Sequence, residues 1–173
     1  RAGDAPAAFA ALLVAADAAA AVAPRAALGF LERVFELWDT AGTATVGVAR
    51  SDRLWQAAEL ASGSVGKERS VELATEALTQ GRPPAGEAWG HERLGRYLWT
   101  SGHLPEAEAE FETAAELLAQ GGDRAEAAAT LAGLGQAELM ACHFEAAERW
   151  CQRLFELVSE PGDDLPAWVM ARR

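Results

Sequence analysis

The strongest constraint on the fold is a spacing of small and large residues that recurs along the chain. Its clearest copy consists of Leu94, Gly95, Leu98, Gly102, Ala107, Phe111 and Ala114. Small residues at such intervals let two antiparallel helices approach closely, and Gly102 allows a left-handed residue at the turn between them. The pattern predicts stacked helix pairs, with an ordinary irregular helical bundle as the alternative.

Weaker copies of the spacing cover most of the rest of the chain. The position of Ala107 recurs as Ala27, Ser70 and Ala147, in steps of unequal length. In the last copy, Cys142 stands at the turn glycine and Cys151 at the large aromatic position. Val22 and Val65 replace the turn glycine in the first two copies.

Apolar periodicity and glycine or proline breaks predict the helices. We expect helices over 5–23, 25–40, 46–62, 67–80, 85–101, 104–120, 123–141 and 144–159, with a ninth beginning in 164–173. Only Thr43–Val48 resembles a strand. Alanine, the best helix former, supplies 41 of the 173 residues. The expected fold class is therefore all-α.

The spacing resembles the tetratricopeptide (TPR) repeat, although its steps are longer than the TPR period of about 34 residues. This resemblance implies a right-handed superhelix of about four antiparallel helix pairs, a fragment of an α-solenoid. The repeats would cover 5–40, 46–80, 85–120 and 123–159, within one domain of 1–173.

Charge and composition exclude several classes of protein. The net charge of −11 argues against binding of nucleic acid by this segment. The apolar run Ala5–Pro24 is mostly alanine and carries Asp17, which argues against a membrane span. Two cysteines provide no disulfide framework, and no signal peptide is recognisable. We expect a cytoplasmic chain, cut from a longer protein.

Three stretches resemble the helical region of large LuxR-type transcriptional regulators. They read RAGDAPAAFAALLVAADAAAAV, ALGFLERVFELWDT and HERLGRYLWTSGHLPEAEAEFETAAELL. In that family a nucleotide-binding module of the signal-transduction ATPase type precedes the repeats, and a helix-turn-helix domain follows them. The resemblance implies that the repeats sense an inducer or a protein partner and contact those two domains within the parent protein.

Catalytic, metal and cofactor sites are not expected. Residues 61–68 imitate a phosphate-binding loop, but Ala61 and Glu68 replace its first glycine and its Ser/Thr. Cys142, His143 and Cys151 lack the spacing of a zinc site. The alternating glutamates of 106–112 spread over two helix faces. We therefore expect neither an enzyme nor a cofactor.

The candidate binding residues follow from the TPR resemblance, because the first helix of each TPR pair lines a concave groove. The predicted groove residues are Trp55, Glu59, Trp89, Glu92, Arg96, Trp99, Gln136 and Met140. On 85–101 they recur at intervals of 3, 4 and 3, and therefore share one helical face. Aromatic residues with an arginine are typical of binding hot spots. The alternative is that Trp89 and Trp99 pack against a neighbouring helix or against a part of the parent protein outside this segment.

The sequence therefore favours a non-catalytic sensor or protein-interaction domain of a multidomain bacterial transcriptional regulator. Its groove would bind a protein partner or a small-molecule inducer. A TPR adaptor in another multidomain signalling protein is the alternative, and a small helical enzyme is a remote one.

Overall fold

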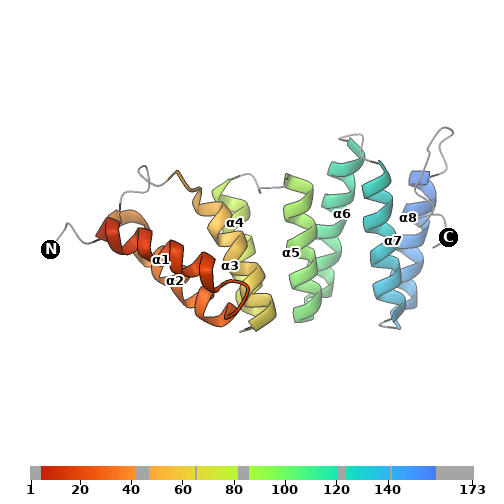
Figure 1. The fold of residues 1–173 in the computed structure, drawn as a ribbon. Helices are drawn as coiled ribbons and strands as arrows, with labels where there is room; N and C mark the ends of the chain where they lie inside the picture. Colours follow the sequence, from red (N-terminus) through yellow and green to blue (C-terminus); the bar gives the residue numbers. More distant parts are fainter. Residues whose placement is uncertain are drawn as a thin grey trace. The chain divides into compact units, whose positions relative to one another are not determined.

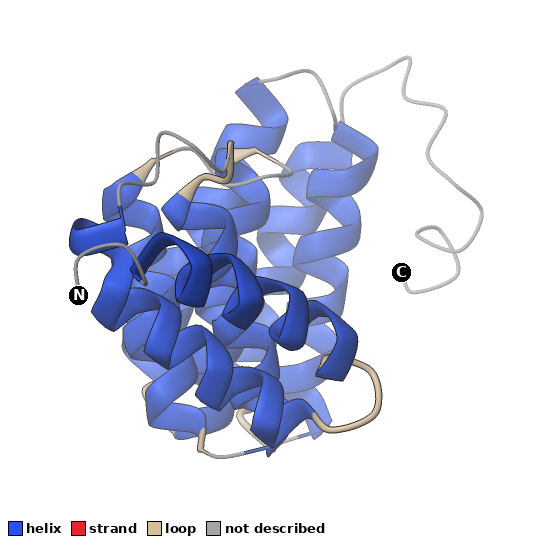
Figure 2. Cartoon of the chain, turned by 60° about the vertical axis from the view of Figure 1, so that its left-hand side comes forward, coloured by secondary structure: helices blue, strands red, loops and turns tan. Residues whose placement is uncertain are grey.

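The chain is all-helical wherever its structure is described. The computed structural model describes residues 5–41, 47–64, 66–81, 86–120, 124–140 and 142–158, which hold eight α-helices and no strand (Figures 1 and 2). The helices are α1 (Ala5–Ala19), α2 (Pro24–Ala41), α3 (Arg50–Ser64), α4 (Lys67–Gln80), α5 (Glu87–Ser101), α6 (Leu104–Gln120), α7 (Arg124–Met140) and α8 (Phe144–Val158).

The observed helix boundaries agree with the predicted ones to within two residues except at two places. Helix α1 ends at Ala19, earlier than predicted, where the carbonyl of Ala19 accepts hydrogen bonds from the amides of Val22 and Ala23. Helix α3 begins only at Arg50, because Gly47 has a φ of 63°, which a right-handed helix does not allow. Residues 43–46 of the predicted strand and the predicted helix at 164–173 lie outside the described residues.

The chain divides into two compact units. Unit 1 comprises Arg1–Gly86 and Arg96–Leu104, and unit 2 comprises Glu87–Gly95 and Pro105–Arg173, so α5 contributes residues to both. In unit 1, α1 packs on α2, α3 packs on α4, and α2 also contacts α3. The side chains of Phe9 and Trp38 are buried there, with their rings edge to face and their centroids 5.2 Å apart.

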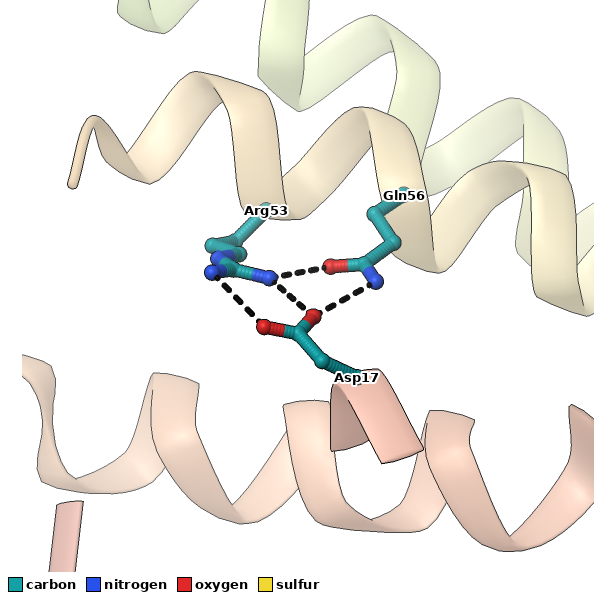
Figure 3. Close-up of polar contacts among 3 residues, drawn as sticks. All are labelled: Asp17, Arg53 and Gln56. Atoms are coloured by element: carbon teal, nitrogen blue, oxygen red, sulfur yellow. Dashed lines mark hydrogen bonds and ion pairs between the residues drawn. The ribbon is translucent and has the colours of Figure 1, made fainter. Parts of the chain in front are cut away.

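Polar side chains connect corresponding helices of successive pairs in unit 1. Between the first helices, Arg53 of α3 binds both carboxylate oxygens of Asp17 of α1, at 2.5 and 3.2 Å (Figure 3). Between the second helices, Arg69 of α4 lies 3.3 Å from Glu32 of α2. The phenol of Tyr97, in the unit 1 part of α5, donates to Glu59 of α3 at 2.8 Å.

Unit 2 shows the same kind of connection. Helix α7 packs on α8, and α8 is joined to α6, the preceding second helix, by two ion pairs. Arg149 binds both carboxylate oxygens of Glu108 at 3.0 and 3.1 Å, and Arg153 lies 3.6 Å from Glu116. Corresponding helices of successive pairs therefore contact each other within each unit.

The turns of α5–α6 and α7–α8 match when Gly102 is aligned with Cys142. The amide of His103 donates to the carbonyl of Leu98, and that of His143 donates to the carbonyl of Glu138. These bonds span a left-handed residue, Gly102 (φ 88°) or Cys142 (φ 62°), as in a Schellman turn. The prediction that Cys142 occupies the turn-glycine position is confirmed.

Close helix contacts recur in the same alignment. A Cβ added to Gly95 would lie 2.9 Å from the ring of Phe111, and one added to Gly135 would lie 3.3 Å from Sγ of Cys151. Residues 95 and 135, and likewise 111 and 151, therefore occupy corresponding places in the two pairs. Cys151 takes the place of the aromatic residue, as the sequence predicted.

Candidate functional site

The predicted groove residues are divided between the two units. Trp55, Glu59, Arg96 and Trp99 belong to unit 1, and Trp89, Glu92, Gln136 and Met140 belong to unit 2. The residues from α5 occupy one face of one continuous helix, as their spacing requires.

In unit 1 the predicted groove residues differ in how far their side chains are exposed to solvent. Trp55 is only 3% exposed, so its side chain belongs to the core and offers little surface to a ligand. Glu59 is exposed and accepts the hydrogen bond from Tyr97. Arg96 is exposed, whereas Trp99 is partly buried and its indole Nε1 has no hydrogen-bond partner among the described residues. Glu59 and Arg96 therefore present the accessible polar groups of this half.

In unit 2 the aromatic residue is joined to an arginine that the sequence pattern did not select. The guanidinium of Arg93 lies 5.6 Å from the ring centroid of Trp89, within the range of a cation–π contact. Glu92 is partly buried, and its carboxylate lies 3.9 Å from Arg93. Gln136 is exposed on α7, and the side chain of Met140 lies outside what the structure describes.

The first helices of unit 1 also carry a polar cluster that the sequence did not predict (Figure 3). Gln56 donates to Asp17 at 3.0 Å and accepts from Arg53 at 2.7 Å, so each of the three side chains is hydrogen-bonded to the other two. The hydrogen bond from Arg53, followed by that from Gln56, lowers the pKa of the Asp17 carboxyl below its usual value of 3.8. The signal in the sequence was the single charged residue within the alanine-rich segment 5–23.

A second unpredicted group is a buried carboxylate at the α7–α8 turn. Glu138 is 2% exposed, and its Oε2 lies 2.8 Å from Nδ1 of His143. The corresponding residue of the preceding pair is the buried Leu98. A carboxylate at a core position requires a hydrogen-bonding partner, which His143 supplies across the turn.

These arrangements favour structural roles for the titratable groups. His91 of α5 lies 2.6 Å from Glu110 of α6 and connects the two helices within unit 2. Among the described residues, no three His, Cys, Asp or Glu side chains are grouped as a metal ion would require. Trp38 and Trp150, on the second helices α2 and α8, are buried. No helix in the described part of the chain has both the length and the apolarity to cross a bilayer.

No protein-family model matches the chain, and neither the curated proteins nor the solved structures that were searched include a match.

Proposed function

We propose that this chain is a non-catalytic interaction segment in which TPR-like helix pairs are stacked to form a binding surface. The observation that carries the proposal is the set of contacts between corresponding helices, first with first and second with second. Asp17–Arg53 and Glu32–Arg69 make such contacts in unit 1, and Glu108–Arg149 makes one in unit 2. In repeat proteins, contacts of this kind align equivalent helix faces into one extended surface.

Within unit 1 the proposed binding surface is supplied by α3 and by the part of α5 from Arg96 on, and within unit 2 by the part of α5 up to Gly95 and by α7. Arg96 and Gln136 offer exposed polar groups, and Trp89 and Trp99 add partly exposed aromatic surface. Aromatic and guanidinium groups on a shared helix face suit a protein segment or a small molecule that has an apolar part and an acceptor. Trp55 supports this surface from within the core.

Two exposed groove residues provide a test that does not disturb the core. The double variant Arg96→Ala/Gln136→Ala should retain its helical circular dichroism and its melting temperature. In a cell carrying the parent protein and a reporter gene, it should reduce the inducer-dependent response at least tenfold, as expected for loss of a hot-spot arginine.

A matched control is Arg33→Ala/Gln80→Ala, which removes an exposed arginine and an exposed glutamine from the second helices α2 and α4. The control should leave the reporter response unchanged. Equal responses of the wild type and the Arg96→Ala/Gln136→Ala variant would reject the groove.

We further propose that the segment belongs to a LuxR-type regulator, in which it would respond to an inducer or a partner protein. Determining the sequence that flanks the chain in its gene tests this proposal directly. A phosphate-binding loop upstream and a helix-turn-helix domain downstream are the expected result. A parent protein without either domain would instead favour an adaptor role.

A further inference from the structure

We draw no further inference here: the strongest candidate, the exposed and uncharged face of α1 formed by Val14 and the alanines beside it, is a stripe of small side chains, and nothing in the described part of the chain shows what covers it.

Discussion

The helix pairs α5–α6 and α7–α8 share one frame but satisfy it with different chemistry. The first pair has glycine at the turn, leucine beneath the turn and phenylalanine at the helix contact: Gly102, Leu98 and Phe111. The second pair has Cys142, Glu138 and Cys151 at these three positions. Both pairs nevertheless retain the same turn hydrogen bonds: the amide after the left-handed residue donates to the carbonyl of Leu98 at 3.0 Å in the first pair and to that of Glu138 at 2.9 Å in the second.

This difference separates what the frame requires from what it tolerates. The backbone geometry of the turn is retained even where a non-glycine residue must adopt a positive φ, at a cost of about 1–2 kcal/mol. A core leucine can be replaced by glutamate if a histidine reaches the carboxylate. The aromatic residue at the helix contact can shrink to cysteine, which leaves the contact looser.

The largest expected effect is at the tight contact of α5–α6. Gly95→Ala places a methyl group 2.9 Å from the buried ring of Phe111, which cannot move aside without disturbing the core. Overpacking of this kind costs about 1–3 kcal/mol in the free energy of unfolding. At the corresponding Gly135, where the neighbour is a cysteine at 3.3 Å, alanine should be neutral or slightly stabilising, since alanine favours helix. Urea denaturation measures both values, and equal losses would show that the smaller neighbour at Gly135 does not make room for a methyl group.

The next effect concerns the buried carboxylate of α7–α8. His143→Ala leaves Glu138 without its ring partner and should lower the free energy of unfolding by about 1–2 kcal/mol at pH 7. The change Glu138→Leu reproduces the preceding pair and should abolish this sensitivity. A double-mutant cycle of the two changes measures their coupling. A loss from His143→Ala that persists in the Glu138→Leu background would mean that the histidine stabilises the turn in another way.

A smaller effect, of opposite sign, is expected at the left-handed turn residue. Cys142→Gly removes the strain of a positive φ and should stabilise the chain by about 1 kcal/mol. The reverse change in the other pair, Gly102→Ala, should destabilise it by a similar amount. Thermal unfolding followed by circular dichroism detects both shifts. Destabilisation by Cys142→Gly would show that the thiol makes a stabilising contact that outweighs the strain.

The smallest effect is expected at the loose contact. Cys151→Phe installs the aromatic side chain of the preceding pair opposite Gly135, where the cysteine is exposed. The added apolar surface should stabilise the fold by about 0.5 kcal/mol, well below the full value for a buried phenylalanine. In the Gly135→Ala background the gain should disappear, because the methyl group would then meet a ring as it does at Gly95. The same denaturation series checks this dependence.

Sequence reasoning predicted the helices well because breaks and caps are local signals. Helices α4 and α6 have the predicted bounds, whereas α1 ends earlier than predicted, at Ala19. The alanines of 18–23 favour helix throughout, so no residue there predicts an end at Ala19. The turn is formed instead by the hydrogen bonds of the Val22 and Ala23 amides to the carbonyl of Ala19.

The candidate site was less predictable, because helical spacing assigns a residue to a face but not to a depth. Arg96 and Gln136 are exposed as a groove residue should be, but Trp55 is buried in the core. The Glu138–His143 contact crosses the turn between α7 and α8, so it depends on the backbone conformation of that turn, which helical spacing does not give. The Asp17–Arg53 pair joins residues 36 positions apart, and no local sequence pattern indicates which residue pairs with Asp17.

Helix α1 contributes few large side chains to unit 1. Its buried residues are Phe9, Leu13 and Ala16, and the Asp17 cluster adds one polar connection to α3. Helices with little buried apolar surface open at a lower free energy than the domain around them. The amides of α1 should therefore exchange with solvent deuterium before those of α3, which would make this helix the segment where unfolding of unit 1 begins.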